Sequence, residues 1–466
     1  MSSVYRSSKL TLIWLGAKTE ADAASICLLY QIEEIRQNPA ATKLDKEDAV
    51  IKLIRHPDHQ EKNLASLDSL FCKSWCSRVW VVQEFALSPN IQMNCGHSVL
   101  PVDAIGLLVD IFYEHPFASF SYSYTNLFDR LRQLAHFTDP RPIQMSVCNV
   151  VHFAAVAVLK ASDERDHLYG FLGLLNPDDR SRLLPDYGLD PTNAFTSAME
   201  AILTGVETTS NFWQFLHLAS GCRPISIGLP SWVIHFPSAN MMGSCLSEYN
   251  IFSASRDSMQ DFSFEDSGSV LRISGKIIDS VKTICRPPPH GSENDSWPRK
   301  CFDLLNANLP SYKTGESSQD ICWRMMVCDL HNPGGLAVEP KRAMEGFGSS
   351  YLNDAVFQNS LTHDVLATDT AMKSALKEQR DYQLSMLRSS TFKDMCITQR
   401  RLAGCLGPHS QKDDTICIFS GSSVPHIIRE LPNGNYHLVG EAYIHGIMDG
   451  EVMDWEGIEW KDIRLA

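Results

Sequence analysis

The sequence predicts an α/β fold, in which a small parallel sheet is joined to a helical subdomain and a small C-terminal β-rich module. Three observations lead to this prediction. Apolar strand-like segments alternate with helical patterns between residues 10 and 113, as in parallel sheets whose strands are connected by helices. The periodicity is mostly helical from 127 to 218. Short strands broken by glycine and proline occupy 414 to 451.

The first elements define the small sheet and its helices. Leu10 to Trp14 is an apolar run closed by Gly16, which favours a buried strand of an α/β sheet. Residues 21–37 and 102–113 have helical periodicity, and residues 91–95 alternate between apolar and polar side chains. The order of these segments predicts strand, helix, strand and helix in the first part of the chain.

The C-terminal half has the sequence features of strands and turns. Residues 269–281 alternate like a strand with a bend at Gly275, and residues 286–295 are rich in proline and polar side chains, as in a linker. Asn433-Gly434 is a strong hairpin signal. We therefore predict three segments, namely a first domain at 1–240, a linker and variable helical region at 241–390, and the β-rich module at 391–466.

Arg78 to Leu87 is predicted to form one helix that carries a carboxylate among apolar side chains. Trp80 and Glu84 are four residues apart and share a helix face. A partly buried glutamate costs free energy unless it is paired or used in chemistry. Glu84 therefore either accepts an N–H that ties the helix to the following strand, or it acts on a ligand.

Residues 75–84, Trp-Cys-Ser-Arg-Val-Trp-Val-Val-Gln-Glu, resemble the core signature of the fungal heterokaryon-incompatibility (HET) domain family. The segments that the family places before Val4 are not found, so we expect either a gene model that begins late or an N-terminally truncated, degraded copy. Five more segments resemble landmarks of these proteins in the expected order: residues 4–16, 165–174, 185–187, 230–233 and 439–451.

The Trp-to-Glu spacing also resembles that of Toll/interleukin receptor (TIR) domains, whose enzymatic members cleave NAD. This resemblance implies a TIR-like sheet, with Glu84 as the catalytic residue and Trp80, Arg78 and Arg165 as substrate-binding residues. A carboxylate suits this chemistry because the transition state is oxocarbenium-like. The alternatives are that Trp80 is a core indole and that Arg165 forms an ion pair within the domain, with Glu84 as one candidate partner.

Two hypotheses about function remain open. The HET resemblance implies a nonself-recognition signalling protein that triggers programmed cell death by domain association, with other incompatibility proteins or with itself. The alternative is a TIR-like effector that cleaves NAD through Glu84. On the second hypothesis a complete version is an NAD glycohydrolase, and this chain, without the opening segments of the family, is expected to be inactive.

Composition limits the partners. The net charge of −14 argues against a broad nucleic-acid-binding surface. The 14 cysteines include no CxxC pair, and Pro57 interrupts the run from His56 to His59, so we predict no metal site. We find neither a signal peptide nor an apolar run long enough to span a membrane. We therefore expect a cytoplasmic protein with no cofactor, no nucleic-acid partner and no membrane partner.

Overall fold

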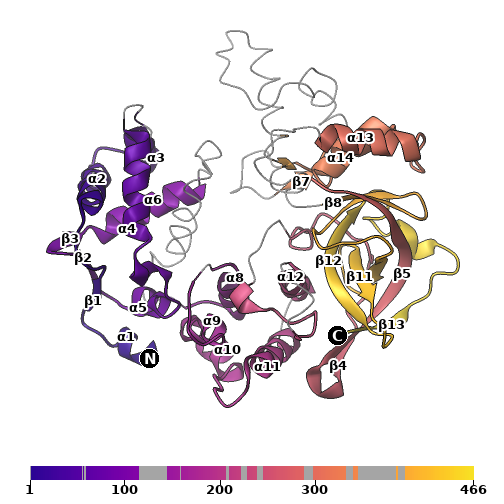
Figure 1. The fold of residues 1–466 in the computed structure, drawn as a ribbon, viewed down its shortest axis with the longest axis horizontal. Coiled ribbons are helices and arrows are strands. Elements are labelled where there is room, and N and C mark those ends of the chain that lie inside the picture. The colour runs from indigo at the N-terminus through magenta and orange to yellow at the C-terminus, as the bar shows by residue number, and fades with distance from the viewer. Residues whose placement is uncertain are drawn as a thin grey trace, which may run out of the picture. The chain divides into compact units, whose positions relative to one another are not determined.

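The chain divides into two compact units, Met1–Pro191 and Thr192–Ala466 (Figure 1). The three segments predicted from the sequence have other boundaries and stay a prediction. The structure is a computed structural model. It describes residues 2–54, 56, 59–114, 144–157, 159–205, 209–221, 228–238, 245–287, 297–331, 340–344, 382, 385–386 and 394–466.

The first unit contains a three-stranded sheet in the order β1-β2-β3. β1 (Thr11–Trp14) pairs in parallel with β2 (Ile91–Cys95), and β3 (Ser98–Leu100) pairs antiparallel with β2. The helix after β1, α2 (Glu20–Gln37), contacts α4 (Gln60–Phe71), α6 (Val102–Glu114) and the strand β3. The strands predicted at residues 10–14 and 91–95 are confirmed, and so is the small parallel sheet that they form. A TIR-like arrangement is not confirmed.

β1 is not buried on both faces, so the predicted buried strand is wrong in this respect. Ile13 is 1% exposed, whereas Leu12 and Trp14 are 67% and 59% exposed. Successive side chains of a strand point to opposite faces, so one face of β1 packs on the core and the other lies at the surface. A short apolar run of this length is compatible with a strand that is buried on one face and with a strand that is buried on both.

The predicted helix from Arg78 begins later than expected, at Val81. Arg78 has an extended backbone, with φ −93° and ψ 140°. The Val79 N–H donates to the Lys160 carbonyl oxygen (3.1 Å), and the Lys160 N–H donates to the Ser77 carbonyl oxygen (2.6 Å). These long-range backbone bonds hold the segment before Trp80 out of the helix. Only α5 (Val81–Leu87) is helical.

The remaining helices of the first unit are mostly short. The predicted helical periodicity after residue 127 is confirmed in the described residues, while 127–143 lie outside them. The bounds are α1 (Ser2–Arg6), α3 (Lys43–Ile54), α4 (Gln60–Phe71), η1 (Ser74–Ser77), α6 (Val102–Glu114), α8 (Val147–Val156), α9 (Asp166–Tyr169), η3 (Leu172–Leu174) and α10 (Pro177–Arg182).

A closed sheet forms the second unit. Around the ring, β5 pairs with β10, then β10 with β11, β11 with β12, β12 with β9, β9 with β8, and β8 with β5 again. Closure leaves none of these six strands as a free edge. The bounds are β5 (Val270–Cys285), β8 (Asp394–Thr398), β9 (Ala403–Leu406), β10 (Thr415–Phe419), β11 (His426–Glu430) and β12 (Tyr436–Ile444).

Further elements surround this ring. β4 (Phe262–Glu265) and β13 (Lys461–Leu465) pair with β5, and the helices α13 and α14 pack on each other beside the strands (Figure 1). The bounds are α11 (Pro191–Thr204), α12 (Thr209–Ser220), α13 (Trp297–Asn308), α14 (Ser318–Met326), β6 (Leu330–His331), β7 (Lys341–Arg342), η4 (Phe236–Ser238), η5 (Asp266–Gly268) and η8 (Glu451–Asp454).

The predicted C-terminal β-rich region is confirmed. The hairpin between β11 and β12 turns at Asn433-Gly434, where Gly434 has φ +82° and the Leu431 N–H donates to the Asn435 carbonyl oxygen (2.8 Å). The predicted strand at 269–281 is also confirmed, as part of the same closed sheet. Most of the linker predicted at 286–295 lies outside the described residues, as does much of the region predicted to be variable and helical.

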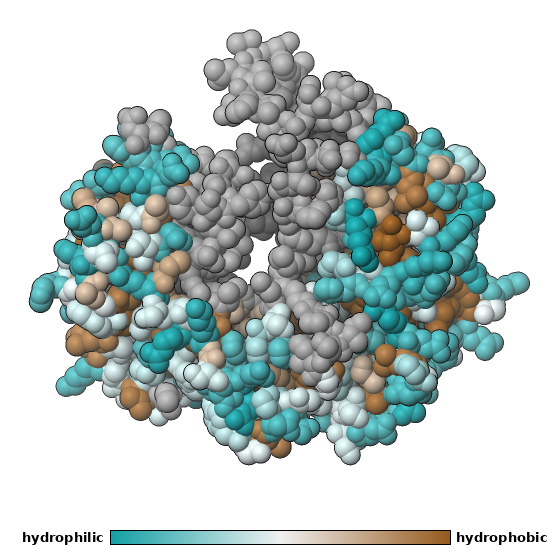
Figure 2. Space-filling model, in the orientation of Figure 1, coloured by the Kyte–Doolittle hydropathy of each residue, from teal (hydrophilic) through white to brown (hydrophobic). Residues whose placement is uncertain are grey.

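The surface drawn in Figure 2 is mainly hydrophilic, with separate hydrophobic patches among the polar side chains. Among the described residues, no helix has both the length and the apolar character needed to cross a membrane.

Candidate functional site

Glu84 is held by aromatic side chains from two other elements. The indole N–H of Trp75, in η1, donates to Glu84 Oε2 at 3.0 Å. The hydroxyl of Tyr5, in α1, also lies at this carboxylate, since the pKa of Tyr5 is raised first by burial and then by Glu84. Glu84 is therefore an N–H acceptor, as one sequence-based alternative expects, but the donor lies in η1 rather than in the strand.

Trp80 is bound to a second carboxylate. Its indole N–H donates to Asp166 Oδ2 at 2.9 Å, and the Tyr187 hydroxyl donates to Asp166 Oδ1 at 2.6 Å. Burial and this hydrogen bond raise the pKa of Tyr187. Asp166 thus connects Trp80, the residue before α5, to the Pro185–Tyr187 segment, and Trp80 is half-buried in this contact.

Arg165 forms an ion pair within its unit, but the partner is not Glu84. Its guanidinium donates to both carboxylate oxygens of Asp163, from Nε at 2.9 Å and from Nη2 at 2.6 Å. Nη1 donates to the carbonyl oxygens of Tyr187 (2.8 Å) and Leu189 (2.5 Å). The proposed pairing with Glu84 is wrong because Asp163, two residues away, occupies the guanidinium. These bonds fix the backbone around Tyr187.

The residue beside Glu84, Gln83, packs against the segment that follows α9. Its side-chain amide is buried and donates to the Gly170 carbonyl oxygen at 2.8 Å. A Cβ at Gly170 would lie 2.1 Å from Val79 Cγ1, and one at Gly173 would lie 2.6 Å from Gln83 Cδ. A side chain at Gly170 would therefore collide with Val79, just before α5, and one at Gly173 would displace the buried amide of Gln83 on α5. Arg6 donates to the Gly173 carbonyl oxygen at 3.1 Å.

The four residues predicted from the sequence are thus distributed over two neighbouring clusters. Arg78 is exposed, and its charge lowers the pKa of Tyr5, so it lies on the Glu84 side. Trp80 and Arg165 lie on the Asp166 side. Sequence reasoning did not assign roles to the partners that hold these residues, although each lies in a quoted family landmark: Tyr5, Trp75, Asp166 and Tyr187.

Chemically, this arrangement is a pair of carboxylates that accept hydrogen bonds from neutral aromatic donors. Such contacts suit the anionic form of a carboxylate. Donors and acceptors come from different parts of the same unit, so these contacts link α5 and Trp80 just before it to α1, η1 and α9. The geometry around Glu84 therefore accounts for its partial burial without a ligand.

The second unit brings together side chains that can hold a metal ion, although the sequence predicts no metal site. The donor atoms of His217, Cys245 and Glu441 all lie within 4.8 Å of one another. Metal sites are recognised in a sequence from closely spaced ligands. These three residues are widely separated along the chain, so no spacing signal marks them.

Comparisons with known proteins agree with the motifs. Residues 1–84 match the family described as "Heterokaryon incompatibility protein (HET)", and residues 350–462 match the "Het-6 beta-barrel domain". The chain is 22% identical over 545 residues to "Heterokaryon incompatibility protein 6, OR allele" of Neurospora crassa, with 97% of this chain and 78% of that protein covered. No solved structure matches. The resemblance to the HET family is confirmed.

Proposed function

We propose that this chain, a HET-domain protein with a Het-6 beta-barrel domain, acts in heterokaryon incompatibility. On this proposal it works in the cytoplasm of fused cells as a nonself-recognition protein and triggers programmed cell death by domain association. Its partners are other incompatibility proteins or a second copy of itself. The named relative is a heterokaryon incompatibility protein, which supports the general assignment.

The observation that carries the association step is the edge of β1. Among the described strands, β1 pairs only with β2, so it is an edge strand of this sheet. Leu12 and Trp14 on the same strand are 67% and 59% exposed. An edge strand with exposed apolar side chains is suited to pairing with another chain.

The contacts of Glu84 support signalling without catalysis. A catalytic carboxylate must direct an oxygen at the reacting atoms. The described contacts of Glu84 are with Trp75 and Tyr5, which places its carboxylate among side chains of the same unit. The contacts are those of a packing residue and give no support to NAD cleavage.

Expression of the chain from an inducible promoter in a filamentous fungus tests this proposal. We expect loss of viability that persists in Glu84→Gln, because the amide oxygen can still accept the Trp75 N–H. The double change Leu12→Ser and Trp14→Ser should remove killing, because it removes the apolar side chains of the β1 edge. Met259→Ser is the matched control, since Met259 is 87% exposed and lies in the other unit.

Cellular NAD is measured in the same cultures. If killing is accompanied by NAD depletion and is lost in Glu84→Gln, with the β1 variant still active, the protein is an NAD-cleaving effector instead. If the chain does not kill, or if the β1 variant and the control kill equally well, association through β1 is wrong.

A further inference from the structure

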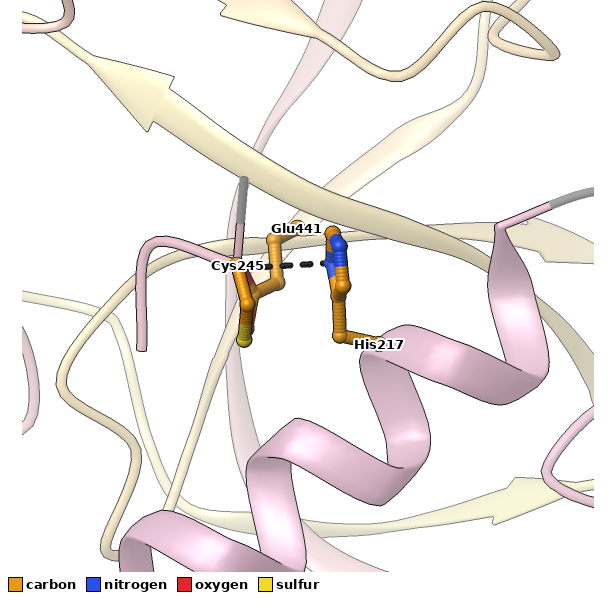
Figure 3. A group of neighbouring side chains, drawn as sticks. All are labelled: His217, Cys245 and Glu441. Carbon is orange, nitrogen blue, oxygen red and sulfur yellow. Dashed lines mark hydrogen bonds and ion pairs between the residues drawn. The ribbon is translucent and has the colours of Figure 1, made fainter. Parts of the chain in front are cut away.

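Three potential metal ligands meet in the second unit (Figure 3). His217 comes from α12, Glu441 from β12, and Cys245 from the segment before Tyr249. Glu441 Oε2 lies 3.4 Å from His217 Nδ1, and Glu441 Oε1 lies 3.5 Å from Cys245 Sγ. The side chains of His217 and Glu441 are 14% and 2% exposed, and Cys245 is buried.

These separations are close to those of a tetrahedral zinc site. With Zn–S about 2.3 Å and Zn–N and Zn–O about 2.0–2.1 Å, neighbouring donors of such a site lie about 3.3–3.6 Å apart. His217 Nδ1 lies 3.4 Å from Oε2 of Glu441, and Cys245 Sγ lies 3.5 Å from Oε1. Thiolate, imidazole and carboxylate are ligands that zinc accepts. A rotation of the carboxylate that brings one oxygen to both neighbours would complete the set.

Glu441 is a carboxyl group enclosed by the protein. Its side chain is 2% exposed, and its Oε2 lies 3.4 Å from His217 Nδ1. A carboxylate, an imidazole and a thiol that meet away from solvent form a donor set that divalent ions such as zinc bind.

The surrounding contacts hold the ligands in place. The Leu246 N–H donates to Glu441 Oε2 at 2.8 Å, and the Ser247 hydroxyl donates to Oε1, which fixes the residues next to Cys245. On α12, Trp213 lies one helical turn before His217, and its indole N–H donates to the Gly421 carbonyl oxygen at 2.9 Å. Such supporting hydrogen bonds orient the ligands in metal sites.

We propose that His217, Cys245 and Glu441 bind a zinc ion. The site joins α12 and the Cys245 segment to the closed sheet through β12. The three side chains leave a fourth coordination position for water or another ligand. This proposal is independent of the function proposed above, since it concerns other residues in the other unit.

Metal binding is tested on the purified full chain, stripped with a chelator and then supplied with Zn²⁺ or Co²⁺ alone. We expect about one ion per chain in mass spectrometry, as for a mononuclear site. With Co²⁺ we expect the intense visible bands of a tetrahedral ion and a thiolate-to-cobalt charge-transfer band. X-ray absorption of the zinc protein should show one sulfur and otherwise nitrogen or oxygen ligands.

Variants assign the ion to these residues. Cys245→Ser should remove the charge-transfer band, and His217→Asn and Glu441→Gln should each weaken binding by about 100-fold or more, since loss of a supporting residue alone costs 10–100-fold. Cys417→Ser is the matched control, because Cys417 is fully buried in the same unit and lies outside the cluster. It should bind zinc like the parent chain.

Several results would overturn the proposal. One is the absence of zinc and cobalt binding in the parent chain, and another is equal binding by Cys245→Ser and Cys417→Ser. A zinc spectrum with no sulfur, or with more than one, also contradicts it. The spectrum of the parent chain decides the question even if the variants fail to fold. In these cases Glu441 is a carboxylate held by its hydrogen bonds and by His217.

Discussion

Single residues of the first unit connect elements that lie far apart in the sequence. Glu84 accepts a hydrogen bond from the indole N–H of Trp75. Asp166 accepts one hydrogen bond from the indole N–H of Trp80 and another from the Tyr187 hydroxyl. Hydrogen bonds to a charged acceptor are stronger than neutral ones. The conspicuous Trp-to-Glu spacing thus serves two separate pairings, in which Trp80, just before α5, and Glu84, on α5, bind different partners.

The glycine after α9 is a position where a single methyl group should destabilise the first unit. A Cβ at Gly170 would lie 2.1 Å from Val79 Cγ1 and 2.8 Å from the Asp166 carbonyl oxygen. We expect Gly170→Ala to cost about 1–3 kcal/mol of stability through overpacking. Gly407→Ala is the control, because a Cβ there has no neighbour within 4 Å. Urea unfolding of both variants measures the difference, and equal midpoints would contradict the packing argument.

Asp394 gives a pH dependence to the second unit. Burial raises its pKa to about 6, against the opposing effect of Arg286. The folded state therefore binds this proton more tightly than the unfolded state, whose carboxyl has a pKa of about 3.9. Folded-state stability falls as pH rises from about 4 to about 6, by on the order of 2–3 kcal/mol, and the loss is complete above that window.

The variant Asp394→Asn tests this dependence. Its amide does not titrate, so its urea midpoint should change less between pH 4 and pH 7 than that of the parent chain. Above about pH 6 the variant should be relatively more stable, because the parent then buries a charge that Arg286, with a side chain 60% exposed, compensates incompletely. Parallel pH profiles of the two proteins would show that Asp394 does not titrate in this range.

At the scale of elements, β1 is a strand whose position was predicted correctly, whereas its burial on both faces was predicted incorrectly. Its pairing with β2 runs from Thr11 opposite Ile91 to Trp14 opposite Asn94. The side chains alternate between core and surface, so neighbouring positions on the strand have opposite roles.

A pair of substitutions measures this alternation. Ile13→Ala should cost about 2–4 kcal/mol, because Ile13 is 1% exposed and the change leaves a cavity. Leu12→Ala should change stability by less than about 0.5 kcal/mol, because Leu12 is 67% exposed. Chemical unfolding of the two variants provides the comparison. Similar costs would mean that both faces of β1 are covered.

The long strand β5 organises the second unit. Its 16 residues pair with β4, β13, β10 and β8 along their length. One strand can serve so many neighbours because different stretches of it hydrogen-bond to different partners. The sheet therefore closes only when β5 meets strands that follow it by more than a hundred residues in the sequence.

For the whole molecule, the division at Pro191 implies that the second unit has a core of its own. Trp213 of α12 stacks on Phe419 of β10, with ring centroids 5.7 Å apart. This contact brings α12 into the core of the closed sheet.

We expect a fragment of residues 192–466 to be soluble and to unfold cooperatively. A fragment that begins at residue 221 should be less stable by about 3 kcal/mol or more, because it lacks the buried indole of Trp213. Circular dichroism and urea unfolding of the two fragments check this. If the fragment of residues 192–466 is insoluble or does not unfold cooperatively when it is produced alone, the two units do not fold independently.

The sequence by itself determined the elements whose signals are local, and the resemblance to the HET family. Alternation at 91–95 predicts β2, the turn chemistry of Asn433-Gly434 predicts the last hairpin, and motifs in order predict the HET resemblance. These features follow from neighbouring residues, whose periodicity and backbone preferences are visible in the sequence.

Tertiary structure alone decided which side chains meet. The acceptor of the Trp80 indole N–H and the meeting of His217, Cys245 and Glu441 depend on how distant segments pack. Backbone pairing of Val79 with Lys160 likewise decided where α5 begins. A sequence pattern reports the local preference of a segment, whereas the partner of a buried polar group is selected by the three-dimensional arrangement that satisfies it.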